Sequence, residues 1–320
     1  MKEDFKLLKV KIKFITQPFS PLEADMFWGK LMWVARLLDL CKELDFKNTP
    51  SLIISDPFPA GFLPRPLSFY IPFSKLTTLG SKFKKTIASL ITKSRFLPFD
   101  EVKELANGKT DIFKMIEERN ERKRCPVAGF TLTQLPKQLK TCLNNCTTGA
   151  GKECREVIKT FLNSAYDIYV FTSWQIERIK RLFYFLGKFG YGKRCSAGAG
   201  LFKVQRIEVL PRDLFSTDSM QSFCNLSTGY VPMEGEEFRE IYGDIYYKWG
   251  KLGKWKDRHI LPFKYPIAKY RAGSVFMEVN SVKEFYGQLI SGIHPEREEV
   301  LEYCFAFPLW GRFKNERNSC

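Results

Sequence analysis

The sequence GKFGYGKRCSAGAG occupies residues 187–200 and is followed directly by the alternating stretch LFKVQRIEV, residues 201–209. Five glycines fall among three cations, Lys188, Lys193 and Arg194. Glycine permits positive φ and lets backbone amides approach an anion with no Cβ in the way. Because cations flank this backbone, the stretch predicts a loop that binds phosphate groups. The alternative is a long glycine-rich turn between a helix and a strand, with no ligand.

The order of the elements around this loop excludes two nucleotide-binding fingerprints. Gly187, Gly192 and Lys193 have the spacing of a P-loop, GxxxxGK, but Arg194 stands where Ser or Thr would reach Mg²⁺. A P-loop follows a strand and opens a helix, whereas residues 173–186 before this loop have a helical pattern and a strand pattern follows it. The dinucleotide motif GxGxxG is also absent in that context. We therefore exclude nucleoside triphosphate hydrolysis and dinucleotide binding.

The composition is that of a globular protein with an excess of positive charge. Of the 320 residues, 44% are hydrophobic and 27% charged, which allows a substantial core and predicts two domains. The net charge of +16 favours a polyanionic partner, and nucleic acid over membrane, because no basic amphipathic anchor stands out. Aromatic residues make up 15% of the chain, so that some could stack on unpaired bases while most fill the core.

The sequence predicts a cytoplasmic protein. No apolar run approaches the roughly 20 residues needed to cross a bilayer. The N-terminus, MKEDFKLLKVKIKFI, alternates like a strand and lacks the apolar centre and cleavage site of a signal peptide.

Cysteine and histidine usage predicts neither a metal site nor a cofactor. Nine cysteines, an odd number, argue against a disulfide framework in such a chain. Cys142, Cys146 and Cys154 match no common zinc spacing and have no histidine nearby. The two histidines, His259 and His294, both lie in the C-terminal part, which excludes imidazole chemistry in the N-terminal two-thirds.

The hydrophobic pattern predicts an α+β fold. Residues 6–16 alternate like a strand with one wet face, and apolar residues recur at helical spacing over 24–44. An extended, proline-rich segment follows at 52–73. Without the insertions, the order is close to βαββαβ, the ferredoxin-like pattern shared with RNA-recognition modules. The later elements of this pattern are a strand, a helix and a strand at 165–172, 173–186 and 201–210.

We therefore expect two ferredoxin-like (RRM-like) domains. The first covers residues 1–212 and contains the glycine-rich loop 187–200. An irregular insertion at 126–159, rich in turn residues, fits a projecting β-hairpin thumb. The second domain, residues 213–320, is expected to be α+β and a degenerate ferredoxin-like copy.

Five stretches in order resemble the RAMP superfamily of CRISPR proteins, and within it the fourth Csm subunit of type III-A effector complexes. The glycine loop marks the superfamily, while the SDPFPAGFLPRP and AGSVF segments narrow the resemblance to this subunit. The five stretches span most of the chain and are SPLEADMFWGKLMW (20–33), ISDPFPAGFLPRP (54–66), LGKFGYGKRCSAGAGLFKV (186–204), YRAGSVFMEV (270–279) and HPEREEVLEYCFAFPLWG (294–311).

The resemblance implies a non-catalytic RNA-binding subunit that serves antiviral defence in a prokaryotic cytoplasm. Proteins like this hold the repeat-derived 5′ tag of the CRISPR RNA (crRNA) and dock beside the large polymerase/cyclase subunit, which makes cyclic oligoadenylate. A backbone RAMP subunit contacts the other side. Members of the family also insert a β-hairpin thumb into the guide–target duplex. Residues 126–159 occupy the place of the thumb in the order, although their cysteine-rich sequence departs from the usual one.

A single-stranded tag has splayed bases and a phosphate at every nucleotide, which suits amide-lined loops, cations and stacking rings. The loop glycines would let the backbone approach phosphates, Lys193 and Arg194 would neutralise charge, and Ser196 would donate a hydrogen bond. Phe189 or Tyr191 could stack on a base or pack in the core. The expected RNA-binding residues are Gly187, Lys188, Gly190, Tyr191, Gly192, Lys193, Arg194, Ser196, Gly198 and Gly200 in the loop, Phe19 and Ser20 after the first strand, Lys30 on the first helix, and Lys137, Lys140 and Asn145 in the thumb.

Two alternatives remain open. A metal-independent CRISPR repeat endoribonuclease of the same superfamily would share the fold and the glycine loop, but such cleavage usually employs His, Tyr or Lys. Both histidines lie far from the expected N-terminal catalytic position, so we expect no enzyme. The other alternative is a structural or regulatory protein with no RNA contact, whose basic charge serves only to bind an acidic partner.

Overall fold

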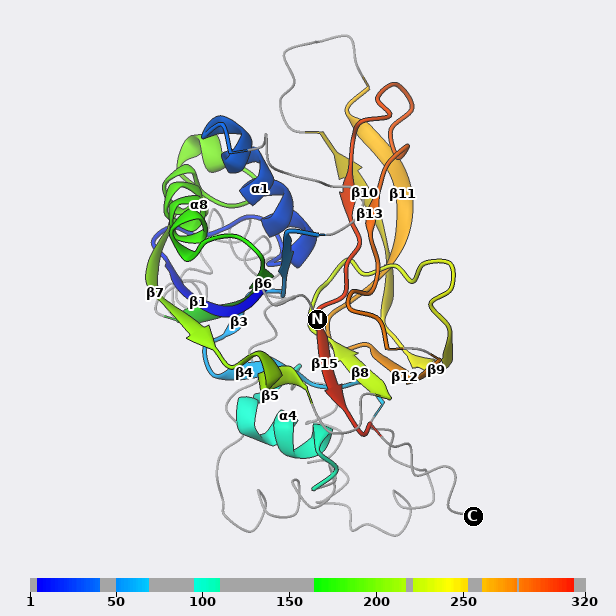
Figure 1. Cartoon of the computed structure of the whole chain (residues 1–320). Helices are drawn as coiled ribbons and strands as arrows, with labels where there is room; N and C mark the ends of the chain where they lie inside the picture. The colour runs from blue at the N-terminus through cyan, green and yellow to red at the C-terminus, as the bar shows by residue number, and fades with distance from the viewer. Residues whose placement is uncertain are drawn as a thin grey trace, which may run out of the picture.

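The computed structural model describes residues 5–40, 50–68, 95–109, 164–216, 221–252, 261–280 and 282–313. The predicted thumb, 126–159, lies outside these ranges, as do Lys137, Lys140 and Asn145. Within the described ranges the chain forms two units, each with an antiparallel sheet (Figure 1). Helices pack on the sheet of the first unit, whereas strands and loops make up the second.

The first unit has the βαββαβ order that the sequence pattern predicts. In its sheet the strands are ordered β2–β6–β1–β7, and β3 also pairs with β6. Strand β7 therefore lies on one side of β1 and β6 on the other, while β2 lies at the edge beside β6. The elements are β1 (Lys6–Phe14), α1 (Ala24–Leu37), β2 (Leu52–Ile54), β3 (Phe58–Pro59), β6 (Ala165–Thr172), α8 (Ile176–Phe189) and β7 (Phe202–Leu210).

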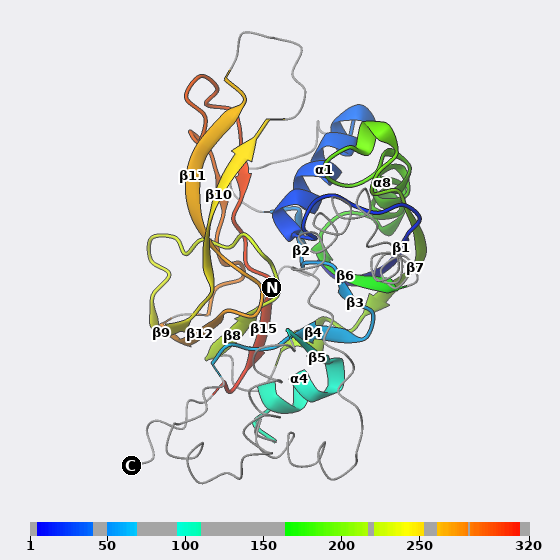
Figure 2. The same cartoon turned by 180° about the vertical axis from the view of Figure 1, so that it is seen from behind.

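β1 is central because it pairs with β6 on one side and β7 on the other, and its alternation gives it one apolar face. Val10 and Ile12 are fully buried, while Lys11 between them lies on the other face of the sheet. The apolar face of β1 packs under α1 and α8, which lie side by side in both views (Figures 1 and 2). The buried residues of the helices recur at helical spacing, as predicted: Phe27, Leu31 and Val34 on α1, and Ile179, Leu182, Phe183 and Leu186 on α8.

The opposite face of this sheet is partly covered by a small helical layer. Here β4 (Phe62–Pro64) pairs with β5 (Phe96–Pro98), which leads directly into α4 (Phe99–Ala106). The ring of Tyr169 on β6 contacts Phe215 in the short turn η3 (Arg212–Phe215), with 4.9 Å between ring centroids.

The second sheet repeats the strand order of the first without its helices. The order is β15–β8–β12–β9. As in the first sheet, the last strand in sequence (β15) lies beside the first (β8), and the second strand in sequence (β9) lies at the edge. No α-helix occurs among the described residues from 221 to 313. The described residues agree with the α+β class predicted for the chain, and their α-helices, α1, α4 and α8, all lie before residue 190. The strands of this sheet are β8 (Ser222–Asn225), β9 (Phe238–Tyr242), β12 (Val275–Val279) and β15 (Pro308–Gly311).

A two-stranded ribbon is inserted between the second and third strands of this sheet. It consists of β10 (Ile245–Lys251) and β11 (Phe263–Tyr270) (Figure 2). The short strands β13 (Leu289–Ile290) and β14 (Glu302–Tyr303) pair with each other, and Glu302 contacts Lys264 of β11 at 2.6 Å. One face of the ribbon is turned toward α1 and carries Lys248 and Lys269. The other face exposes aromatic rings to solvent.

None of the helices in the described segments is long and apolar enough to cross a lipid bilayer.

Candidate nucleic-acid interface

The predicted glycine-rich loop starts later than its sequence suggested. Helix α8 continues through Gly187 and Lys188 to Phe189, so the glycine loop of the structure comprises residues 190–200. Gly187 is buried against β7, where a Cβ atom would lie 2.4 Å from the carbonyl oxygen of Phe202. Gly187 therefore permits close helix–strand packing, a structural role rather than the RNA contact expected of it.

The glycine loop folds back on itself. Gly190 and Gly200 both have positive φ, and a Cβ atom on Gly200 would lie 2.1 Å from the carbonyl oxygen of Tyr191. The loop is closed there by the amide of Tyr191, which donates to the carbonyl oxygen of Gly200 at 2.9 Å. Arg194 at the tip also has positive φ, 61°. This conformation is energetically unfavourable for any residue that has a Cβ atom. The loop therefore has a fixed, strained shape that glycine makes possible.

The segment that joins β1 to α1, residues 15–23, holds the glycine loop in place, and we call it the connector. The amide of Lys193 donates to Ser20 Oγ at 2.9 Å, and the amide of Gly200 donates to the carbonyl oxygen of Gln17 at 3.0 Å. Thr16 Oγ1 accepts from the amide of Leu201 at 2.9 Å. The structure thus brings the predicted residue Ser20 to the loop, but as a buried support. Thr16 and Gln17, which the sequence analysis did not single out, have the same supporting role.

Tyr191 anchors the glycine loop in the core. Its side chain is fully buried, and its ring stacks on Phe27 with 4.0 Å between centroids. The hydroxyl donates to the carbonyl oxygen of Pro21 and accepts from the amide of Glu23, while burial raises the pKa of Tyr191 well above its ordinary value. Of the two roles that the sequence leaves open for Tyr191, the structure shows packing in the core.

Most of the loop glycines use their amides inside the fold. The amides of Gly190, Gly198 and Gly200 donate to the carbonyl oxygens of Leu186, Cys195 and Gln17, so these three donors are used within the fold. Four amide donors of the loop make no hydrogen bond within the described part of the chain. They belong to Gly192, Arg194, Cys195 and Ser196.

The cations of the loop lie beside these amides. Lys193, Arg194 and Ser196 are all exposed. The guanidinium of Arg194 lies 5.1 Å from the ring centroid of Phe19, so the predicted residue Phe19 forms an opposing wall of the loop. Lys30 on α1 also reaches the loop, with its Nζ 3.8 Å from the sulfur of Cys195. Cations and unpaired amides on one rigid bend form a surface that attracts anions.

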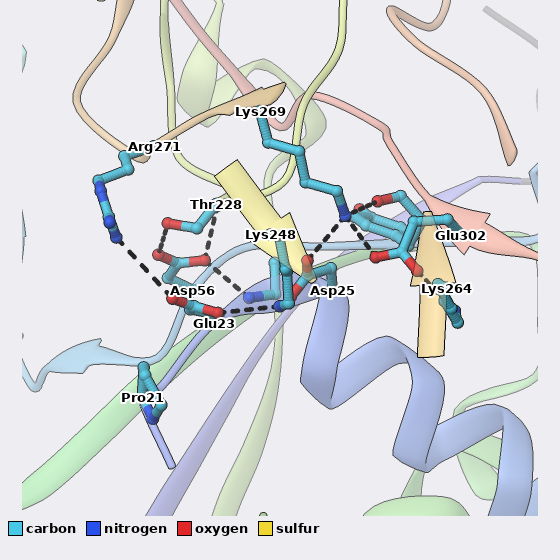
Figure 3. Close-up of polar contacts among 12 residues, drawn as sticks. Pro21, Glu23, Asp25, Asp56, Thr228, Lys248, Lys264, Lys269, Arg271 and Glu302 are labelled. Atoms are coloured by element: carbon cyan, nitrogen blue, oxygen red, sulfur yellow. Dashed lines mark hydrogen bonds and ion pairs between the residues drawn. The ribbon is translucent and has the colours of Figure 1, made fainter. Parts of the chain in front are cut away.

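A buried network of charges fixes the start of α1, and with it the connector (Figure 3). Asp25 in the first turn of α1 contacts Lys248 at 2.6 Å and Lys269 at 2.9 Å, both from the ribbon of the second unit. Lys269 also contacts Glu302, and Lys248 contacts Glu23 at 3.0 Å. Burial alone would raise the pKa of Asp25, but the two lysines hold it below its ordinary value. The network therefore joins the two units through ionised groups.

Asp56 caps α1 from outside the helix. Its Oδ1 accepts from the amide of Ala24 at 2.8 Å and from the amide of Thr228 at 2.7 Å, while the Thr228 hydroxyl donates to Oδ2. Asp56 is buried, and burial raises its pKa to about 7 although these hydrogen bonds favour the charged form. The negative charge of Glu23 adds to the rise.

Asp56 makes the stability of the fold depend on pH near neutrality. Between pH 4 and pH 7 the native state holds a proton on Asp56 that the unfolded state releases, so stability falls as pH rises through this window. We expect the free energy of unfolding to be about 1 kcal/mol lower at pH 8 than at pH 6, as measured by urea denaturation. Asp56→Asn keeps the shape but cannot ionise, so this variant should lose most of that slope; an unchanged slope would contradict the assignment.

No group of three His, Cys, Asp or Glu side chains suited to hold a metal ion occurs in the segments that the structure describes. Cys142, Cys146 and Cys154 lie outside these segments.

The geometry defines a basic bend of rigid backbone on an α+β scaffold. No protein-family model matches the chain, and no curated protein matches its sequence. The chain is similar to crystal structures of Csm1–Csm4 cassettes. For the cassette in complex with cA4, the TM-score is 0.48 at 14% identity, covering 95% of this chain and 98% of the other. The cassettes with pppApA and with one ATP give TM-scores of 0.47 and 0.45 at 14% and 16% identity, with the same coverage.

Proposed function

We propose that this chain is a non-catalytic RNA-binding subunit of a type III-A CRISPR (Csm) effector complex, in which it caps the 5′ repeat-derived tag of the crRNA in antiviral defence. The observation that carries the proposal is the glycine loop, where Lys193, Arg194 and unpaired amides share one exposed bend. The net charge of +16 and the five ordered stretches that resemble the fourth Csm subunit support it.

The chemistry of the loop suits the phosphates of a single strand. Phosphate oxygens accept hydrogen bonds from amides, and the unpaired amides of Arg194, Cys195 and Ser196 are consecutive. Lys193 and Arg194 supply the charge, and the Ser196 hydroxyl supplies one more donor. Because the connector fixes the backbone, the site is formed before RNA arrives and binding costs little ordering entropy.

The proposal extends to the assembly. The tag-binding subunit anchors the large polymerase/cyclase subunit, contacts the backbone RAMP subunit, and meets target RNA at the thumb, in a prokaryotic cytoplasm. Its two units are a ferredoxin-like pair, and the equal strand order of the two sheets supports this description of the second, helix-free unit.

The double variant Lys193→Glu with Arg194→Glu tests the proposed function. We expect weaker binding to single-stranded RNA, and a log–log salt dependence flatter by about one unit for each phosphate group that the protein no longer neutralises. In the complex, the 5′ end of the crRNA should become poorly protected from nuclease. The control, Lys251→Glu with Arg239→Glu, makes the same charge change at exposed positions of the second unit. Normal affinity and tag protection in the first variant would contradict the site; an equal loss in both would indicate only bulk charge.

The structure gives the ribonuclease alternative no support at His294. This side chain is buried, its Nε2 lies 2.6 Å from the carbonyl oxygen of Leu261, and its Nδ1 accepts from the amide of Glu296 at 3.1 Å. Both ring nitrogens are thus engaged with backbone groups, as in a structural histidine. Cleavage of repeat RNA by the purified chain without metal would overturn the non-catalytic assignment. A protein-only module, the other alternative, would bind no RNA and show no effect of the loop variant.

A further inference from the structure

Two aromatic rings lie exposed beside the glycine loop, one on each helix of the first unit. Trp33 on α1 is 45% exposed and Phe189 at the end of α8 is 43% exposed. Their ring centroids are 5.2 Å apart and their planes meet at 78°. We call this pair the aromatic shelf. Neither ring contributes to the hydrophobic core of the first unit.

The aromatic shelf is continuous with the glycine loop through one side chain. Lys30 Nζ lies 5.5 Å from the ring centroid of Trp33 and 3.8 Å from the sulfur of Cys195 in the loop. Phe189 directly precedes Gly190, the first residue of the loop. The neighbouring nucleotide of an RNA bound at the loop would therefore lie against the aromatic shelf.

Two lysines, Lys30 and Lys188, border the shelf. Neither forms an ion pair with a carboxylate of the described segments. Lys188 lies 4.4 Å from the ring centroid of Tyr184, which is also exposed. Lysine is depleted at the centre of protein–protein interfaces, whereas cations next to exposed rings are typical of surfaces that bind single-stranded nucleic acid.

We propose that the aromatic shelf stacks on a nucleobase of the same single-stranded RNA whose phosphates bind at the glycine loop. The inference rests on the proposed function and adds a base-contacting subsite to it. A base that stacks on one ring directs its edge toward the other ring, because the two rings are nearly perpendicular. Lys30 and Lys188 neutralise the phosphates on either side. Stacking of this kind tolerates any base, since every base has a π-face.

The test compares two matched double variants of the full chain. Trp33→Leu with Phe189→Leu removes the rings of the shelf and keeps an apolar side chain at each position. The control, Trp249→Leu with Tyr247→Leu, removes two rings of 65% and 68% exposure from the ribbon. The probe is a fluorescently labelled single-stranded RNA of mixed sequence, about 12 nucleotides long to match the site size of such grooves, titrated by anisotropy at several salt concentrations.

We expect the shelf variant to bind this RNA about tenfold more weakly than wild type with an unchanged salt slope, because stacking releases no counterions. The ribbon control should bind like wild type. An RNA of the same length that lacks its bases should bind the shelf variant and wild type equally. Ultraviolet crosslinking of the mixed-sequence RNA should yield a peptide that contains Trp33 or Phe189.

Each other outcome overturns a distinct statement. Unchanged affinity of the shelf variant, with the loop variant impaired, overturns the shelf and leaves the loop site standing. Loss of affinity for the base-free RNA as well shows that the shelf does not act by stacking. Absence of RNA binding by wild type overturns the proposed function itself. Normal RNA binding with failure to co-purify with the other Csm subunits would make the shelf a protein interface instead.

Discussion

Replacement of Lys269 by methionine is expected to lower the free energy of unfolding by about 3–5 kcal/mol. The Lys269 side chain is fully buried and its Nζ contacts Asp25 at 2.9 Å, Glu302 at 2.5 Å and the carbonyl oxygen of Tyr303 at 3.3 Å. Methionine fills a similar volume but leaves two buried carboxylates without this partner. Asp25 then keeps only Lys248 and Glu302 keeps only Lys264, so each buried carboxylate loses part of its compensating charge, which costs free energy.

Urea denaturation at pH 7 measures this effect. Lys251→Met is the matched control, because Lys251 is an exposed lysine of the same ribbon, and its loss should cost less than about 0.5 kcal/mol. Addition of Asp25→Asn to Lys269→Met should restore part of the lost stability, since it removes one of the two buried carboxylates that lost Lys269 as a partner. A cost near that of the control would show that the network is open to water.

Replacement of Gly200 by alanine is expected to disrupt the glycine loop and the RNA binding assigned to it. The new Cβ atom would lie 2.1 Å from the carbonyl oxygen and 2.8 Å from the amide nitrogen of Tyr191. These are backbone atoms of the residue that anchors the loop, so the loop must open and the hydrogen bond between Tyr191 and Gly200 must break. We expect a loss of about 2 kcal/mol or more in stability, together with a strong loss of RNA affinity.

Gly198 provides the control within the same loop. It also has positive φ, 80°, but a Cβ atom there would meet nothing within 4 Å. Gly198→Ala therefore carries only the conformational cost of about 1 kcal/mol and should retain RNA binding. Unfolding experiments and anisotropy titrations on both variants separate the two contributions. Equal losses in the two variants would show that close packing against Tyr191 does not shape the loop.

The periodic parts of the chain could be predicted from sequence. The alternation of β1 and the helical spacing of apolar residues on α1 and α8 follow from burial of one face, and the resulting βαββαβ order is observed. The end of α8 could not be predicted, because Gly187 looks like a helix breaker. It is tolerated in the helix since Phe202 approaches too closely for any side chain.

Only the exposed side chains of the candidate site could be predicted from sequence. Lys193 and Arg194 are exposed, as cations next to a loop usually are. Which loop residues face inward depends on hydrogen bonds with the connector, which span 170 and 173 positions in sequence. Tyr191 is buried for this reason, and no local pattern reveals it. Lys269 likewise meets Asp25 across 244 positions, in a strand whose pattern gives no sign of a buried charge.

The charge network also determines when the first turn of α1 can take its final structure during synthesis of the protein. A ribosome releases the N-terminal half first, and Asp25 then emerges long before Lys248, Lys269 and the strand that carries Glu302. Until those residues arrive, the first turn of α1 lacks its buried counter-charges and the connector lacks a fixed end. The nascent chain therefore lacks the fixed connector that shapes the glycine loop, and the loop takes its final form only after the ribbon and Glu302 have been made.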